Sequence, residues 1–215
     1  MIGVMMKNAR YWLIYAGGFF TVLNAYWIKE KRPLNMEMAV LNSFFIYFLA
    51  VAPLLAIEAV EERYRGYEFL RTLPVRMRDV VMGKYAMPLI VVAALAAGNL
   101  AMTGRFDGSP ELLARYRGTI LASAGVSLVI AGLAYILVYR FGVKSLMVAL
   151  GAVILLLNVL GMLAVRGLIP GVGRIFRGFG SLAPGWGLYA GLVAAVAAYF
   201  ALMAAAIRIR SGMKG

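Results

Sequence analysis

Charged residues are missing from six long stretches of the chain, and no other sequence feature constrains the fold as strongly. A helix rises about 1.5 Å per residue, so roughly 20 uncharged residues cross a hydrocarbon core of about 30 Å. Each stretch reaches about that length, and we therefore predict six transmembrane helices. Their approximate spans are residues 11–28, 38–57, 85–104, 118–139, 145–165 and 185–207.

The apolar runs favour helices over a membrane β-barrel. A barrel strand alternates polar and apolar residues over about 10 positions, whereas residues 89–97 and 153–157 contain no polar side chain. Hydrophobic residues make up 63% of the chain and charged residues 14%, which is too apolar a composition for a water-soluble domain. We predict an all-α, multi-pass protein of the cell (cytoplasmic) membrane, in which residues 1–215 form a single transmembrane domain within the lipid bilayer.

The distribution of Lys and Arg sets the expected orientation. Thirteen basic residues fall at the two termini and in the loops on their side of the membrane, and nine fall in the loops on the other side. Because basic residues accumulate on the cytoplasmic side, we predict that both termini are cytoplasmic. The formal charge of +13 is then explained by contact with anionic headgroups, and we expect no nucleic-acid partner. The first span lacks a cleavage site and is expected to be retained.

Several kinds of chemistry are excluded by the residues that the chain lacks. Cysteine and histidine are both absent, which removes thiol nucleophiles, Ser-His and Cys-His pairs, and the usual zinc sites. The glycine-rich residues 171–178 match no nucleotide-binding motif, because Phe176 stands where a dinucleotide loop needs glycine and no Gly-Lys-Ser/Thr follows. We therefore expect neither enzymatic activity nor a bound cofactor or metal in this chain.

The uncharged stretches contain few polar groups. Asn24, Asn42, Asn99 and Asn158 place one amide in each of four predicted spans. Hydrogen bonds between helices are one interpretation of these amides, and a polar lining for a transport passage is the other. In the last span Gly187, Gly191 and Ala195 follow one another at four-residue spacing, which predicts close packing against a neighbouring helix.

The longest charged loop, residues 58–84, carries most of the functional signal. Within it Tyr64, Tyr67 and Leu70 follow one another at three-residue spacing and form one stripe of a predicted short helix. Pro74 ends that helix, and a second short helix is expected at residues 76–81. Pro53 and Pro88 lie in the flanking spans and can kink them. An amphipathic segment on the headgroups and a docking element for a partner both fit this pattern.

The segment from Glu62 to Tyr85, which contains Glu62, Gly66-Tyr-Glu-Phe-Leu-Arg-Thr-Leu-Pro-Val-Arg76 and Gly83-Lys-Tyr85, resembles the membrane subunits of ABC-2-type transporters. The similarity is strongest to small permeases of bacterial ABC exporters, a group that includes exporters of amphipathic peptides such as phenol-soluble modulins. This resemblance implies a cytosolic coupling helix between the second and third spans. It also implies two permeases working with two copies of a separate ATPase that binds ATP and Mg, and re-entrant helices within residues 167–184.

The resemblance, together with the helical stripe, assigns an ATPase-coupling role to a set of residues in and around the loop. These are Glu62, Tyr64, Gly66, Tyr67, Glu68, Leu70, Leu73, Pro74, Arg76 and Lys84.

We predict that the chain is the permease subunit of an ABC exporter for hydrophobic or amphipathic substrates, with peptides as one candidate class. It is expected to associate with a second permease and a separate ATPase. The alternative is an ATP-independent channel or secondary carrier, which usually needs titratable groups within its spans; the predicted spans have none. A membrane-embedded enzyme or sensor is a third possibility, but the chain offers no catalytic constellation for it.

Overall fold

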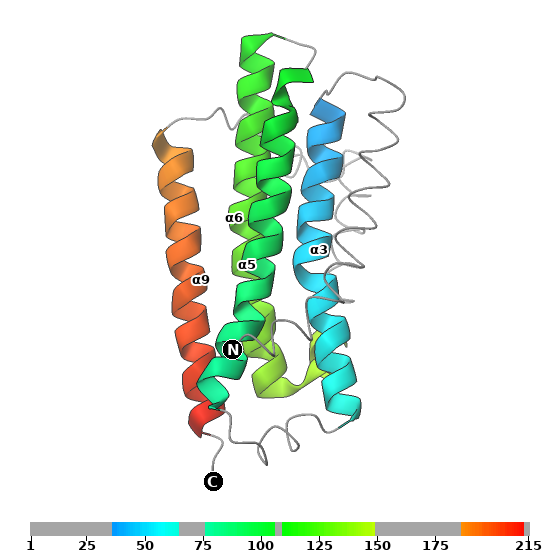
Figure 1. The fold of residues 1–215 in the computed structure, drawn as a ribbon, viewed down its shortest axis with the longest axis vertical. Helices are drawn as coiled ribbons and strands as arrows, with labels where there is room; N and C mark the ends of the chain where they lie inside the picture. The colour runs from blue at the N-terminus through cyan, green and yellow to red at the C-terminus, as the bar shows by residue number, and fades with distance from the viewer. Residues whose placement is uncertain (1–35, 65–75, 106–108, 149–185, 213–215) are drawn as a thin grey trace, which may run out of the picture.

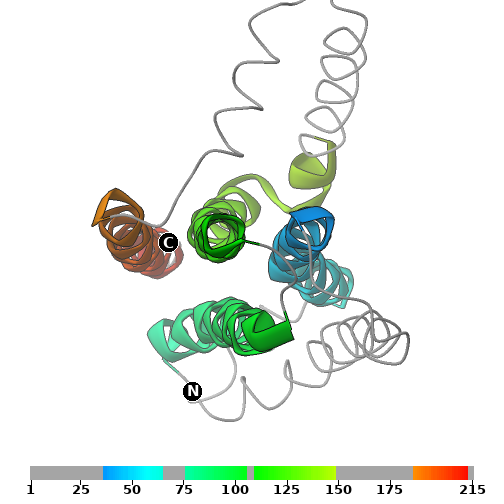
Figure 2. The same cartoon turned by 90° about the horizontal axis from the view of Figure 1, so that it is seen from above.

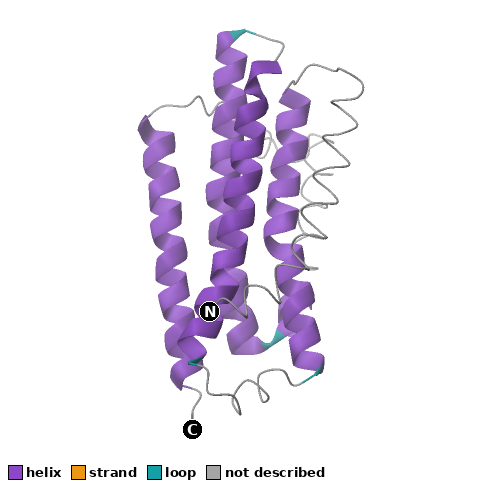
Figure 3. Ribbon diagram, viewed as in Figure 1, coloured by secondary structure: helices purple, strands orange, loops and turns teal. Residues whose placement is uncertain are grey.

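The computed structural model describes residues 36–64, 76–105, 109–148 and 186–212, and these ranges are helical throughout apart from short turns (Figures 1 and 3). No strand occurs within them, so the predicted all-α class is confirmed. The predicted span at 11–28, most of that at 145–165, the helical part of the loop after Tyr64 and the re-entrant segment 167–184 lie outside the described residues.

Four long helices make up the described fold. They are α3 (Met36–Arg63), α5 (Met77–Ala101), α6 (Pro110–Phe141) and α9 (Trp186–Gly212), with a short 3-10 helix η2 (Met102–Arg105) after α5. Each of the four is long and apolar enough to cross a membrane. They correspond to the second, third, fourth and sixth predicted spans. The total of six spans and the orientation of the termini stay predictions.

Helix α6 lies in the middle of the bundle and packs against α3, α5 and α9 (Figure 2). Its start is fixed by Ser109, whose side chain accepts a hydrogen bond from the backbone N–H of Leu112, and by Pro110 in the first turn. Its end is fixed by Gly142, which has a φ of 82°. Glycine reaches this left-handed backbone conformation without the steric cost that other residues meet.

The two ends of the bundle differ in which helix termini they gather. Helix α3 ends where α5 begins, and the last turns of α6 and α9 lie at the same end (Figure 1). We call this the loop end, because residues 65–75 join α3 to α5 there. The first turns of α3, α6 and α9 gather with η2 at the opposite end. By the predicted orientation, the loop end is cytoplasmic.

Close packing between α6 and α9 depends on glycines of α6. A Cβ atom placed on Gly132 would lie 2.9 Å from Leu202 Cδ1, and one placed on Gly125 would lie 3.2 Å from Ala195 Cβ. Among the described residues, no atom lies within 4 Å of a Cβ position on Gly187 or Gly191, so the described structure shows the predicted close packing at Ala195, and the packing of the two glycines stays a prediction. Four-residue steps rotate about 40° around a helix, which turns the two glycines away from the α6 contact.

At the opposite end, the structure places Asn99 between helices. The Asn99 amide donates to the carbonyl of Leu95 at 2.8 Å, and its oxygen accepts from the Tyr116 hydroxyl on α6 at 3.4 Å. The predicted interhelical hydrogen bond is therefore present at this position. Asn42 is buried on α3, whereas Asn24 and Asn158 lie outside the described residues.

Both helices that flank the predicted 58–84 loop run further than expected. Helix α3 continues to Arg63 and α5 begins at Met77, so the short helix expected at residues 76–81 is instead the first turn of α5. Pro53 and Pro88 lie inside α3 and α5, which continue on both sides of them. Several charged residues of the predicted loop therefore belong to helices that are long and apolar enough to cross a membrane.

Candidate functional site

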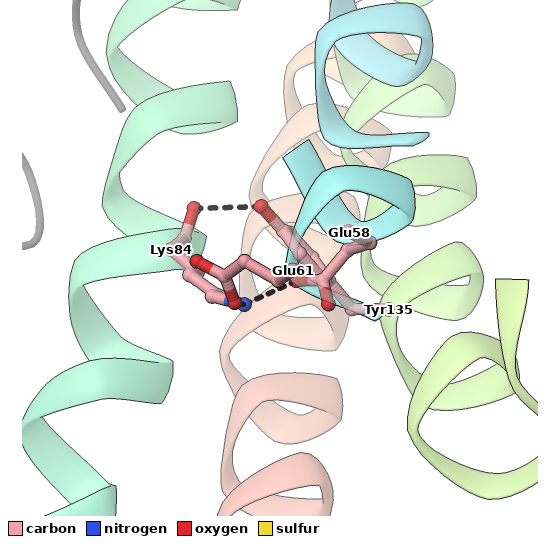
Figure 4. A network of polar contacts seen from close by, with 4 residues as sticks. All are labelled: Glu58, Glu61, Lys84 and Tyr135. Carbon is pink, nitrogen blue, oxygen red and sulfur yellow. Dashed lines mark hydrogen bonds and ion pairs between the residues drawn. The ribbon is translucent and has the colours of Figure 1, made fainter. Parts of the chain in front are cut away.

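A buried ionic cluster joins the end of α3 to the start of α5. Lys84 Nζ lies 2.6 Å from Glu58 Oε1 and 2.6 Å from Glu61 Oε2 (Figure 4). The exposed fraction is 0% for the Lys84 side chain, 1% for Glu58 and 4% for Glu61. We call these three residues the ionic cluster. The expectation that the spans contain no titratable group is thus wrong for the candidate spans Asn42–Arg63 and Met77–Ala101.

Helix geometry explains why two carboxylates meet one ammonium. Glu58 and Glu61 are three residues apart on α3 and therefore share a face, and Lys84 reaches both from the second turn of α5. An isolated charge in such an environment would be prohibitively costly, whereas opposite charges at hydrogen-bonding distance compensate one another. Charges on two helices can therefore be buried only if the helices stay side by side. This makes the ionic cluster a specific link between α3 and α5.

Pro88 explains a hydrogen bond between α5 and α6. Pro88 has no N–H and therefore leaves the carbonyl oxygen four residues earlier, that of Lys84, without its helical donor. The hydroxyl of Tyr135 on α6 donates to this oxygen at 3.1 Å (Figure 4). A buried carbonyl without a partner is costly, so Tyr135 satisfies the gap that the proline creates. The ionic cluster is thereby fixed to α6 as well.

Two further tyrosines extend the connection to α9. The Tyr85 hydroxyl donates to the Gly132 carbonyl at 3.0 Å, and the Tyr199 hydroxyl of α9 donates to the Tyr85 carbonyl at 2.7 Å. The rings of Tyr85 and Tyr135 stack with centroids 4.7 Å apart, and those of Tyr85 and Tyr199 lie 5.2 Å apart. Each of the three tyrosines is almost fully buried. Aromatic packing and the hydroxyl donors together hold α5, α6 and α9 in one arrangement.

A second cation lies close to the ionic cluster. The Arg210 guanidinium of α9 is 4.6 Å from the centre of the Tyr139 ring, and Lys84 Nζ is 5.9 Å from the same ring. Cations are attracted to the faces of aromatic rings at such distances. Tyr139 therefore connects the last turn of α9 to the cluster between α3 and α5.

Glu62 makes a separate link at the loop end. Its Oε2 accepts a hydrogen bond from the backbone N–H of Val143 at 3.0 Å, just beyond the turn at Gly142. Residues 143–148 form a short helix, so the Glu62 carboxylate satisfies one of the N–H groups that are free at a helix start. The last turn of α3 is thereby connected to the segment that follows α6.

The predicted coupling residues fall into three groups. Tyr64 and Arg76 are exposed at the two edges of residues 65–75. Glu62 and Lys84 make the intramolecular contacts described above, so Lys84 does not present its charge at the surface. The third group lies outside the described ranges and consists of Gly66, Tyr67, Glu68, Leu70, Leu73 and Pro74. The coupling role of all three groups stays a prediction.

Sequence reasoning missed Glu58, Glu61 and the tyrosine partners of α5. The three-residue spacing of the two glutamates and the position of Lys84 four residues before Pro88 are the available signals, but a rule that places every charge outside the hydrocarbon assigns these residues to a loop. No group of His, Cys, Asp or Glu suited to a metal ion occurs among the described residues. The described contacts of the site hold helices together: the ionic cluster joins α3 to α5, and Tyr135 joins α5 to α6.

A family model described as ABC-2 family transporter protein matches residues 5–210. Neither the curated proteins nor the solved structures gave a significant match.

Proposed function

Because the chain belongs to the ABC-2 family of transporter proteins, we propose that it is the transmembrane permease subunit of an ABC exporter. In this proposal it forms the substrate passage with a second permease copy, and a separate ATPase binds ATP and Mg and drives transport. The observation that carries the proposal is the family match over residues 5–210. Four helices suited to membrane crossing support it.

The ends of α3 and α5 are the proposed route of coupling. Residues 65–75 leave α3 and return to α5, and the stripe of Tyr64, Tyr67 and Leu70 docks on the ATPase. A movement of this segment reaches two helices at once, because the ionic cluster joins them within two turns of their ends. Tyr135 then carries the displacement to α6. If α3 and α5 were not joined by the ionic cluster, a movement of residues 65–75 would displace one helix without the other.

The proposed cargo is hydrophobic or amphipathic. In the described spans, the buried polar groups toward the opposite end are neutral, as Asn99 and Ser127 are, and a passage beside these groups would offer no compensation for a charged substrate. An apolar cargo loses little on leaving water for this environment. Amphipathic peptides are one class that meets this condition.

The buried ionic cluster also gives a reason to keep the alternative of an ion-coupled carrier, because titratable groups inside membrane spans can take part in ion movement. The cluster lies within two turns of the helix ends, where its charges contact each other, whereas coupling ions usually bind near the midplane. Reconstitution of the chain alone separates the two functions. A proton or sodium gradient drives uptake in a carrier, whereas the permease remains inactive until the ATPase and ATP are added.

The coupling proposal is tested by capturing the cognate ATPase with variants of the chain. Tyr67→Asp puts an unpaired carboxylate into the proposed contact, where a buried anchor typically contributes about 2 kcal/mol or more. Ser145→Asp adds the same charge to an exposed position at the loop end and is the matched control. We expect Tyr67→Asp to lose the ATPase and Ser145→Asp to retain it. Equal recovery with both variants would contradict the coupling role of this segment.

A further inference from the structure

An open depression of about 350 Å³, which we call the cavity, lies between the first turns of α5 and the last turns of α9. These two helix ends are neighbours at the loop end of the bundle (Figure 1). The cavity is lined by Arg78 and Met82 of α5 and by Met203, Ala204, Ile207 and Arg208 of α9. It is separate from the ionic cluster, whose residues do not line it.

Two arginines line this cavity, one from each helix. Arg78 and Arg208 are both exposed, and neither forms an ion pair within the part of the chain that the structure describes. Asp79, the acidic residue of the same α5 turn, does not line the cavity. Like charges on opposite walls repel each other, and an anion between them removes that repulsion. The start of α5 adds to the attraction, because its N-cap residue Arg76 makes no side-chain capping bond.

The remaining lining residues are apolar, and three of them, Met82, Met203 and Ala204, lie about one turn further into the spans than the arginines. Met82 follows Arg78 by four residues, and Ala204 precedes Arg208 by four, so on each helix an apolar residue lies directly above an arginine. Met203 and Ile207 complete this wall. The cavity therefore has a cationic rim toward the membrane surface and an apolar wall toward the hydrocarbon.

From this arrangement we propose that the cavity binds an anionic phospholipid of the leaflet that faces the loop end. The phosphodiester lies between Arg78 and Arg208, and the first part of an acyl chain lies against Met82, Met203 and Ile207. A phospholipid combines an anion with an apolar chain in one molecule, as the lining combines arginines with apolar residues. It is also the neighbour that a membrane helix always has, and basic pockets between membrane helices are known to recognise anionic headgroups. This site is independent of the proposed coupling function.

The experiment is native mass spectrometry of the delipidated full chain titrated with phosphatidylglycerol or phosphatidylcholine. The test variant is Arg78→Ala/Arg208→Ala. The control, Arg140→Ala/Lys144→Ala, removes the same charge from exposed positions at the same end of the bundle that do not line the cavity. We expect the wild type and the control to retain phosphatidylglycerol in preference to phosphatidylcholine. The test variant should lose about tenfold or more in apparent affinity, because two charged contacts are gone.

Two additions identify the ligand source and guard against misfolding. Arg78→Lys/Arg208→Lys keeps the charges and should recover most of the preference, which a loss of fold would not permit. Inorganic phosphate should fail to compete; competition by phosphate would assign the site to a free anion. Competition by dodecyl sulfate equal to that by phosphatidylglycerol would assign it to anionic amphiphiles in general. Equal retention by the test and control variants would overturn the proposed site.

Discussion

At the loop end of the bundle a cluster of charged side chains is buried, whereas at the opposite end the buried polar contacts among the described residues are neutral. Lys84 and its two glutamates are enclosed between α3 and α5, whereas Asn99 and Tyr116 meet through an amide and a hydroxyl. The ion pair resolved near the opposite end, Arg115 with Glu111 at 2.7 Å, has exposed fractions of 39% and 73% and joins residues of one helix.

This difference indicates that the contact between α3 and α5 is more specific than the contact between α5 and α6 at the opposite end. A neutral hydrogen bond between membrane helices contributes about 1 kcal/mol, and helices can slide or separate at that cost. Removing one partner of a buried charged group costs about 3–5 kcal/mol, so the charged contact allows only one arrangement. Among the described residues, the most specific contact therefore lies between the end of α3 and the start of α5, where the proposed function requires the two helices to move together.

Loss of the ammonium should produce the largest effect. Lys84→Met keeps the length of the side chain and leaves two carboxylates buried without their cation, which we expect to lower the free energy of unfolding by about 3–5 kcal/mol. Reversible unfolding in mixed micelles measures this change. The triple variant Lys84→Met/Glu58→Leu/Glu61→Met removes all three charges and should recover most of the lost stability. If Lys84→Met alone unfolds like the wild type, the ionic cluster does not hold the helices.

Loss of the donor opposite Pro88 should produce an intermediate effect. Tyr135→Phe leaves the Lys84 carbonyl without a partner, at a cost of about 1–3 kcal/mol. Pro88→Ala supplies a backbone N–H for the same carbonyl, so Tyr135→Phe should cost less when it is made in the Pro88→Ala background. The same unfolding measurement on the four members of this cycle gives the coupling energy. Equal costs in both backgrounds would contradict the role assigned to Tyr135.

The smallest effect is expected at the opposite end. Asn99→Leu removes the hydrogen bonds to Leu95 and Tyr116 but places an apolar side chain among apolar neighbours, so we expect a loss of about 1 kcal/mol or less. Arg115→Gln, which breaks only the exposed pair, should cost still less. Thermal unfolding of both variants beside Lys84→Met gives the ranking. A cost for Asn99→Leu equal to that for Lys84→Met would remove the distinction between the two ends.

The sequence predicted the helices of this fold better than it predicted their ends. Four predicted spans coincide with α3, α5, α6 and α9, because a bilayer demands long uncharged stretches and such stretches are visible in a single chain. The same rule ended the spans at Glu58 and Lys84, since it treats every charge as lying outside the hydrocarbon. The two residues are 26 positions apart, and their mutual neutralisation becomes visible only when α3 and α5 are placed side by side.

The hydrogen bonds around the ionic cluster could not be predicted from the sequence for a similar reason. Pro88 predicts a free carbonyl at Lys84, but nothing local indicates that Tyr135, 51 residues later, supplies the donor. Of the stripe from Gly187 to Ala195, the described residues show a close contact only at Ala195, because regular spacing shows that residues share a face of a helix without showing what that face contacts. Tyr64 alone of the predicted coupling stripe lies within the described residues, so the stripe itself stays a prediction.

The proposed coupling requires a rigid connection between the ends of α3 and α5. A distance between spin labels on the two helix ends tests this connection directly. The chain has no native cysteine, so Arg63→Cys and Met77→Cys introduce two labels, one at the end of each helix. The distance is measured in the complex with the cognate ATPase, first without nucleotide and then after trapping with ATP and vanadate. Labelled permease is diluted with unlabelled permease, so that each complex carries one labelled copy. We expect a narrow distribution with the same maximum in both states, and a broad one when Lys84→Met is added. A wild-type maximum that moves between the two states, with no further change on Lys84→Met, would contradict the account.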